Sequence, residues 1–140
     1  MNAKLIFYPV LLQIALTLGI YVYLAIAKSR ALKLRQVDLE RRALDAGAWP
    51  DSVRKIANNL GNQFEAPVLY YVLALMLWAL SAVNPFSLAA AWGFSISRVF
   101  HARIHLGSNH VPHRRTVFTI GCLLLLLMLA QCLWSLALEP

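Results

Sequence analysis

The sequence predicts an all-α integral membrane protein, a bundle of four transmembrane helices, from three observations. Hydrophobic residues make up 60% of the 140 residues and charged residues only 14%, against about 25% charged in an ordinary soluble domain. The mean hydropathy is +0.62. Two uncharged stretches of 23 residues, Leu5–Ala27 and Thr116–Leu138, can each cross a bilayer core of about 30 Å as a helix. These features exclude a soluble enzyme, a disordered chain and a soluble nucleic-acid-binding protein.

A single membrane domain over residues 1–140 is expected, because two further apolar stretches lie between these two. The second stretch is interrupted once, by Glu65, and the third is apolar until Ser97 and polar afterwards. Short links join the last three stretches, so neighbouring helices run in opposite directions. The expected spans are, in chain order, 5–27, 56–83, 86–106 and 116–138.

The link over 28–55 is long and basic, with eight basic and four acidic residues. We expect Lys28–Ala46 to extend the first helix and Gly47 to end it. Asp51 or Ser52 can then cap the second helix. Two oppositely charged i,i+4 pairs favour the extension: Asp38 with Arg42, and Arg41 with Asp45.

Basic residues gather on one side of the predicted bundle, in the link 28–55 and in the loop 107–115. The opposite side carries only Lys4 and Glu139. The positive-inside rule therefore places both termini outside and the basic loops in the cytoplasm. The net charge of +7 then suits anionic lipid headgroups rather than nucleic acid.

Two stripes of polar residues enter the predicted membrane region. Ionisable groups at this depth cost about 2.5–3.5 kcal/mol each and face the bundle interior. The second helix runs outward and the third inward, so the stripes meet at similar depth, where Glu65 can pair with Arg98. The basic loop adds His110, His113, Arg114 and Arg115 to a net positive pocket open to the cytoplasm. The stripes, each at helical spacing, are Arg54, Asn58, Asn62 and Glu65, and Arg98, His101 and His105.

Two other interpretations of these polar residues stay open from the pattern alone. Buried Asn, Glu and Arg side chains can simply hold helices together by hydrogen bonds. His101 and His105 have the i,i+4 spacing of metal ligands. Arginines crowd these histidines and repel a divalent cation, so we expect no metal.

Three motifs resemble those of one family, the membrane-associated proteins in eicosanoid and glutathione metabolism (MAPEG). Asn58–Pro67, with the sequence NNLGNQFEAP, resembles its second-helix motif. Arg98–Gly107, RVFHARIHLG, resembles its third-helix motif, and Pro112–Arg115 resembles the loop that opens its fourth helix. The motifs also occur in the family's order and spacing, and the resemblance covers nearly the whole chain. The chain resembles a bacterial-type member of the family.

The resemblance implies a homotrimer of four-helix subunits in a bacterial inner membrane. Glutathione would lie between neighbouring subunits near the cytoplasmic face, and a lipophilic substrate would approach from the bilayer. Asn62 and Glu65 would bind the peptide backbone or amino group of glutathione, and Arg98 would bind a carboxylate or brace Glu65. The cofactor-binding set implied is Arg54, Asn58, Asn62, Glu65, Arg98 and His101.

The catalytic set that the resemblance implies is Arg114, Arg115 and His105. Arg114 or Arg115 would hold the thiol of glutathione as thiolate, because a neighbouring cation favours the charged nucleophile. His105 stands where relatives often have a tyrosine near the thiol. The protein itself then needs no reactive cysteine.

The expected function is that of a membrane-bound glutathione-dependent transferase or peroxidase acting on lipophilic electrophiles or lipid hydroperoxides. Asn58 and Gly61 stand where several glutathione-using relatives have arginines. That departure favours an alternative, a non-catalytic protein of the same fold that binds lipid or another small molecule. A small multidrug transporter fits less well, because arginines surround Glu65.

Overall fold

The computed structural model describes residues 2–138, which form five α-helices and three short 3₁₀ helices; Glu139 lies outside this range. Two of the helices are long and apolar enough to cross a membrane, within Ala3–Lys33 and Val111–Ala137. The α-helices are α1 (Phe7–Lys33), α2 (Asp51–Gly61), α3 (Ala66–Ala79), α4 (Pro85–Leu106) and α5 (Val111–Leu138). The 3₁₀ helices are η1 (Ala3–Ile6), η2 (Ala46–Ala48) and η3 (Asn62–Phe64).

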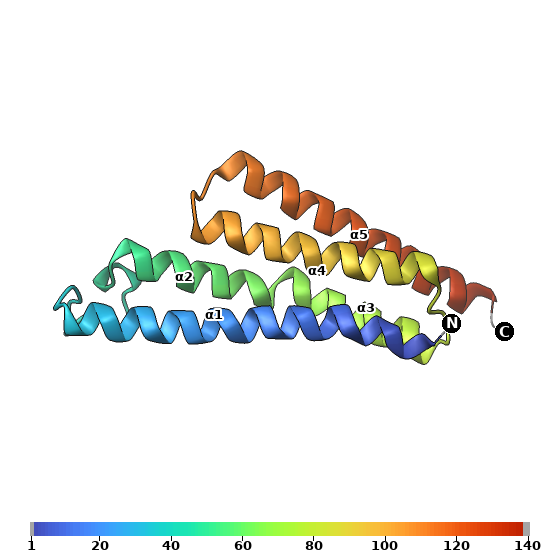
Figure 1. Ribbon diagram of the computed structural model, residues 1–140, viewed down its shortest axis with the longest axis horizontal. Helices are drawn as coiled ribbons and strands as arrows, with labels where there is room; N and C mark the ends of the chain where they lie inside the picture. Colours follow the sequence, from blue (N-terminus) through green and yellow to red (C-terminus); the bar gives the residue numbers. More distant parts are fainter. Residues whose placement is uncertain (1, 139–140) are drawn as a thin grey trace.

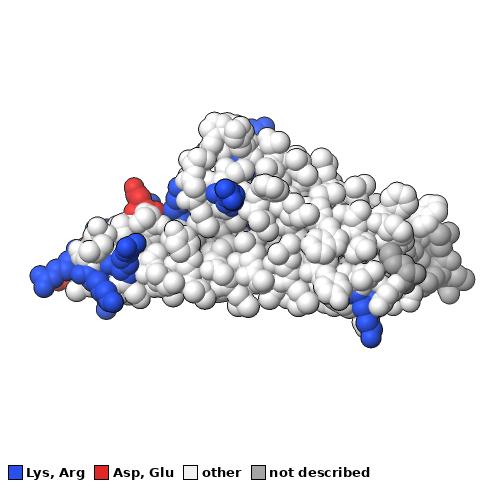
Figure 2. Space-filling view, in the orientation of Figure 1, with Lys and Arg blue, Asp and Glu red and all other residues white. Residues whose placement is uncertain are grey.

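The helices form an elongated bundle (Figure 1). α1 runs along one side of it, and α2 and α3 follow each other beside α1. α4 and α5 form an antiparallel pair that packs on α1 and α3. The start of α1 and the end of α5 lie together at one end, and the link between α1 and α2 lies at the other. Basic side chains gather mainly at that second end, while most of the visible face carries no charge (Figure 2).

The larger cluster of the apolar core lies in the half of the bundle that holds the chain ends. Tyr70 and Phe94 stack there at 4.5 Å between ring centroids, and both are fully buried. Gly121 lets α5 approach α4 closely, since a Cβ at this position would lie 3.0 Å from the Ser97 Oγ. Close packing of this kind fixes the angle of the α4–α5 pair.

The predicted span 56–83 is not one continuous helix. α2 ends at Gly61, η3 follows, and Glu65 has φ −99° and ψ −106° before α3 begins. Pro67 is the cause, because proline lacks an N–H and its ring clashes with the carbonyl four residues earlier. Within the first turn of α3 the same proline is well tolerated.

The predicted helical extension over Lys28–Ala46 is correct as far as Lys33, where α1 ends, and wrong beyond it. Arg35 has φ 53°, in the left-handed region, and the Gln36 N–H donates to the Ala31 carbonyl at 3.0 Å. This geometry ends the helix well before Gly47. Exposed ion pairs contribute too little to hold the extension together.

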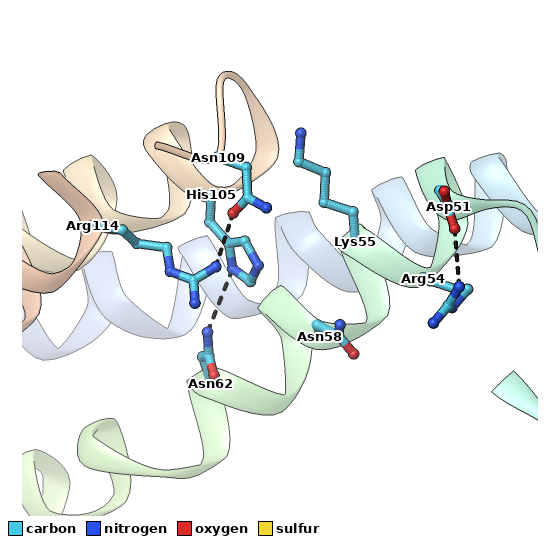
Figure 3. A pocket seen from close by; sticks show the side chains of 8 residues that line it. All are labelled: Asp51, Arg54, Lys55, Asn58, Asn62, His105, Asn109 and Arg114. Carbon is cyan, nitrogen blue, oxygen red and sulfur yellow. Dashed lines mark hydrogen bonds and ion pairs between the residues drawn. The ribbon is translucent and has the colours of Figure 1, made fainter. Parts of the chain in front are cut away.

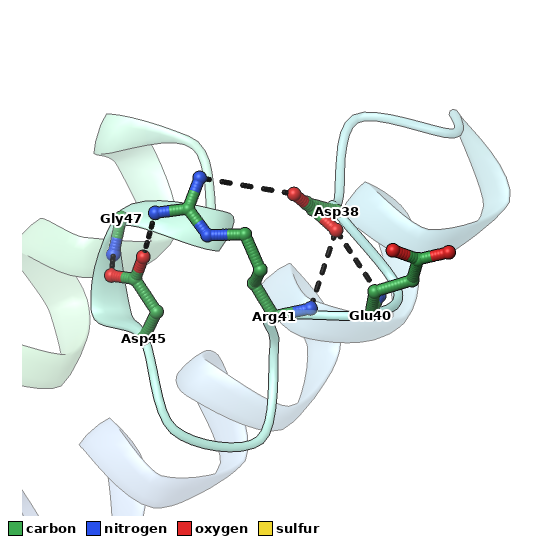
Figure 4. Close-up of polar contacts among 5 residues, drawn as sticks. All are labelled: Asp38, Glu40, Arg41, Asp45 and Gly47. Atoms are coloured by element: carbon green, nitrogen blue, oxygen red, sulfur yellow. Dashed lines mark hydrogen bonds and ion pairs between the residues drawn. The ribbon is translucent and has the colours of Figure 1, made fainter.

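The link instead folds into a compact loop (Figure 4). Arg41 forms ion pairs with both Asp38 and Asp45. Asp45 accepts a hydrogen bond from the Gly47 N–H at 2.7 Å, and this bond, with Arg41, holds the pKa of the Asp45 carboxyl below its ordinary value. Trp49 closes the loop by donating from Nε1 to the Arg42 carbonyl at 3.2 Å.

The start of α2 also differs from the predicted caps. Pro50 precedes the helix in an extended conformation, and no side chain caps the first turn, so a cap by Asp51 or Ser52 is wrong. Asp51 lies in that turn, where a carboxylate interacts favourably with the helix dipole. It pairs with Arg54 at 2.9 Å.

The predicted basic loop 107–115 is a loop only as far as His110. α5 begins at Val111, with Pro112 in its first turn, a position that proline favours. Asn109 turns the chain with φ 54° and donates its N–H to the Ile104 carbonyl at 2.8 Å. Arg114 and Arg115 therefore project from a helix rather than from a flexible loop.

Candidate functional site

A polar pocket of about 450 Å³ opens where α2, the end of α4 and the start of α5 meet. Figure 3 shows Asn62, His105 and Arg114 converging on it from three elements. Three cations face one carboxylate, and that carboxylate, Asp51, already pairs with Arg54, so the pocket favours an anion. Its lining residues are Asp51, Arg54, Lys55, Asn58, Asn62, His105, Asn109 and Arg114.

The second-helix stripe reaches this pocket only in part. Arg54, Asn58 and Asn62 line it, as their spacing of four residues predicts. Glu65 does not, because the backbone changes direction after η3 and leaves its side chain exposed. The predicted ion pair of Glu65 with Arg98 is wrong, since no such contact occurs within residues 2–138.

Arg98 is buried, with 1% of its surface exposed. Its Nη2 donates to the Asn62 carbonyl at 2.9 Å, and its guanidinium lies 5.9 Å from the Phe118 ring centroid. The Asn62 carbonyl is free for this bond because α2 ends there. Within the described residues, Nε and Nη1 of Arg98 have no partner. Arg98 thus joins α4 to the end of α2, and two of its donors are left over.

A chain of side-chain hydrogen bonds runs from α1 to the pocket. Gln13 Nε2 donates to Gln63 Oε1 at 2.9 Å, and Gln63 Nε2 donates to Asn59 Oδ1 at 3.3 Å. Asn59 Nδ2 lies 3.0 Å from His105 Nδ1, and Asn62 Nδ2 lies 3.4 Å from the same atom. An amide nitrogen can only donate, so Nδ1 accepts and the ring proton of neutral His105 sits on Nε2.

Sequence reasoning missed the inner part of this chain, which consists of Gln13, Asn59 and Gln63, all buried. Gln13 is the one amide side chain in the apolar stretch 5–27, and Asn59 and Gln63 are four residues apart. A search for amides at helical spacing would have found the pair, of which Asn59 lies in α2 and Gln63 in η3.

A second, smaller cavity of about 250 Å³ adjoins the pocket and shares Asn62 and Arg114 with it. It brings in the buried His101 together with Arg115 and Phe118. The polar pocket therefore takes Arg114 but not Arg115 from the predicted catalytic pair. His101 Nδ1 has no partner within residues 2–138, which leaves it able to serve a ligand.

Phe118 also lines a third cavity, an apolar groove of about 720 Å³ between α3 and α5. Apolar side chains of both helices, with leucine the most frequent, form most of its walls. Glu65 is the one ionisable carboxylate among its lining residues. The three cavities are therefore connected through shared lining residues. Asn62 and Arg114 line both the polar pocket and the cavity at His101, and Phe118 lines both that cavity and the apolar groove.

These features define a helical membrane protein that sets a cationic pocket beside an apolar groove. The family model of the MAPEG family matches residues 6–134, nearly the whole chain. The protein belongs to the MAPEG family, as the resemblance of its motifs predicts. No curated protein and no solved structure matches it.

Proposed function

We propose that the protein is a membrane-bound glutathione-dependent transferase or peroxidase that acts on lipophilic electrophiles or lipid hydroperoxides. The observation that carries the proposal is the cationic pocket joined, through Asn62, Arg114 and Phe118, to an apolar groove. A polar anion and a lipophilic molecule can then be held side by side. Membership of the MAPEG family is consistent with this chemistry.

The residues of the pocket fit glutathione, a tripeptide with two carboxylates, an amine and a thiol. Lys55 and Arg114 supply cations for the carboxylates and the thiolate, while Arg54 neutralises Asp51. Asn58 and Asn62 supply amide groups that match peptide N–H and carbonyl groups. The volume of about 450 Å³ is typical of a pocket for a small molecule.

Glutathione, when bound, would supply a thiol as the nucleophile. Arg114 is suited to hold its charged form, because its Nη1 donates to Asn109 Oδ1 at 2.8 Å and this bond fixes the guanidinium. The other guanidinium N–H groups remain available for an anion. His105 adds the Nε2–H as a neutral donor on the same pocket wall. Together these donors favour a thiolate over a thiol.

The proposal includes four spans, with both termini outside and the basic loops in the cytoplasm, and a homotrimer. α2, η3 and α3 together would make the second span and α4 the third. Glu65 lies outside the pocket of its own chain. In the trimer its carboxylate would serve a glutathione held by a neighbouring subunit.

The experiment is glutathione binding to the detergent-purified protein, measured by calorimetry and by thiolate absorbance at about 240 nm. We expect binding with a thiolate signal in the wild type and binding without the signal in Arg114→Ala. Arg103→Ala is the control, because Arg103 is an exposed arginine of α4 outside the pocket lining. No binding by the wild-type protein would refute the proposal.

A second function, binding of a lipid or small molecule without catalysis, is favoured by one observation. Asn58 lines the pocket and Gly61 leaves the exposed end of α2 without a side chain, where several glutathione-using relatives have arginines. Two fewer cations weaken the hold on an anion. Binding of glutathione with no thiolate signal in the wild type would support this second function.

A further inference from the structure

A separate cavity of about 290 Å³ lies where the end of α1 meets the loop before α2. Arg54 and Asn58 separate this cavity from the polar pocket described above, because they line both. Its remaining walls come from the loop, from Lys28 of α1 and from Ala57 of α2. Neither the motifs nor the proposed function gives this cavity a role.

One aromatic ring contacts a cation of this cavity and the backbone next to a second cation. The Lys28 Nζ lies 4.9 Å from the centroid of the Trp49 ring, a cation–π contact. The indole N–H of Trp49 donates to the Arg42 carbonyl at 3.2 Å. The half-buried Trp49 therefore holds Lys28 and the Arg42 segment on the same cavity wall.

The charge of these cations is not neutralised by the surrounding loop. Asp45 is the one carboxylate in the lining, and it is already bound by Arg41 and by the Gly47 N–H (Figure 4). Within residues 2–138, neither Lys28 nor Arg42 forms an ion pair. The cavity thus offers two free cations to an anion.

The position of the cavity along the chain matches the depth of lipid headgroups. Lys28 is the first charge after the apolar stretch 5–27, where a helix leaves the hydrocarbon core and a tryptophan prefers to lie. Leu44, in the lining, is 100% exposed, and Leu39 in the same loop is 63% exposed. Acyl chains would cover such leucines, whereas a soluble anion would leave them in water.

We infer that this cavity binds the phosphate headgroup of an anionic phospholipid. Lys28 and Arg42 bind the phosphate, Trp49 forms the wall at the level of the interface, and Leu44 contacts the upper part of the acyl chains. A zwitterionic lipid binds less well, because its own cation is repelled by the two basic residues.

The test uses the fluorescence of Trp49 in a protein with the other three tryptophans replaced (Trp78→Phe, Trp92→Phe, Trp134→Phe). This single-tryptophan protein is reconstituted in two kinds of phosphatidylcholine vesicle. One kind contains brominated phosphatidylglycerol, and the other contains the same fraction of brominated phosphatidylcholine. We expect more quenching of Trp49 by the brominated phosphatidylglycerol. Equal quenching by the two lipids would overturn the inference.

Matched variants identify the cations. The excess quenching is the quenching by brominated phosphatidylglycerol beyond that by brominated phosphatidylcholine. Arg42 lies on an exposed loop, and Arg42→Gln should remove much of this excess. The double variant Lys28→Gln, Arg42→Gln should remove all of it. Arg35→Gln removes the same charge from an exposed position outside the lining and should keep the excess. An unchanged excess in Arg42→Gln and in the double variant would overturn the inference.

Inorganic phosphate distinguishes the lipid from a free anion with the same chemistry. We expect the excess quenching to persist when phosphate is added at constant ionic strength, because the exposed leucines hold only a lipid. Loss of the excess on addition of phosphate would assign the cavity to a soluble anion instead and overturn the choice of a phospholipid.

Discussion

Replacing Asn59 by leucine should change which ring nitrogen of His105 carries the proton. Asn59 and His105 are both buried, and Asn59 Nδ2 lies 3.0 Å from His105 Nδ1. The second donor to that atom, Asn62 Nδ2, is farther away, at 3.4 Å. Asn59→Leu therefore removes the closer of the two contacts that keep Nδ1 unprotonated, and the proton can then move from Nε2 to Nδ1.

The size of the effect follows from the loss of one hydrogen bond, because Asn62 Nδ2 remains as a more distant partner of His105 Nδ1 at 3.4 Å. The net contribution of one hydrogen bond is about 0.5–1.5 kcal/mol. A change of about 1 kcal/mol in the tautomer preference is a factor of about 5 in the population ratio. We expect the Nε2–H tautomer to predominate in the wild type and both tautomers to be populated in Asn59→Leu.

The assay is ¹⁵N NMR of the protein labelled at its histidine rings, which distinguishes a protonated from an unprotonated ring nitrogen. His105→Gln assigns the His105 signals. Gln131→Leu is the control, since Gln131 also makes one amide hydrogen bond, to the Ala82 carbonyl at 2.9 Å, away from His105. A wild-type ring protonated at Nδ1, or a tautomer ratio unchanged in Asn59→Leu, would refute the reasoning.

Three further predictions concern catalysis, assembly and packing. Arg114→Ala should lower the rate of glutathione conjugation by about 100-fold and the affinity far less, by steady-state kinetics; equal rates would contradict its role. Coexpressed Glu65→Gln and Arg114→Ala subunits should regain activity that each variant lacks alone, and mixed trimers without recovery would place both residues in one subunit's site. Gly121→Ala should destabilise the α4–α5 pair by about 1–3 kcal/mol in detergent unfolding, because its Cβ would meet the Ser97 Oγ. Gly19→Ala, with nothing within 4 Å of the new Cβ, should not.

The part of the site that could be predicted from sequence is the part that follows helical periodicity. Arg54, Asn58 and Asn62 reach one pocket because all three belong to the same short helical segment and its immediate continuation. The same spacing rule gave a wrong prediction for Glu65, three residues further along the chain. Glu65 leaves the stripe because the turn before Pro67 changes the direction of the chain. Periodicity holds only while the backbone stays helical.

The loop before α2 shows a different limit of sequence analysis. The pairs of opposite charge predicted a helix over Lys28–Ala46, and the ion pair of Arg41 with Asp45 does form, but around a turn. Ion pairs at this spacing can form on more than one backbone. The decisive contact, from the Trp49 indole to the Arg42 carbonyl, joins residues seven apart that no periodic pattern connects.

The break between α2 and α3 explains why the polar groups of the site lie where they do. In a continuous helix the Asn62 carbonyl would accept the N–H of Ala66, and Arg98 would share this acceptor with the helical bond. With the break, this carbonyl binds Arg98 Nη2, and the Asn62 side chain remains close to His105. The same break directs Glu65 to the apolar groove. One proline thus separates a cationic pocket from a carboxylate that would otherwise neutralise it, and keeps that pocket suited to an anion.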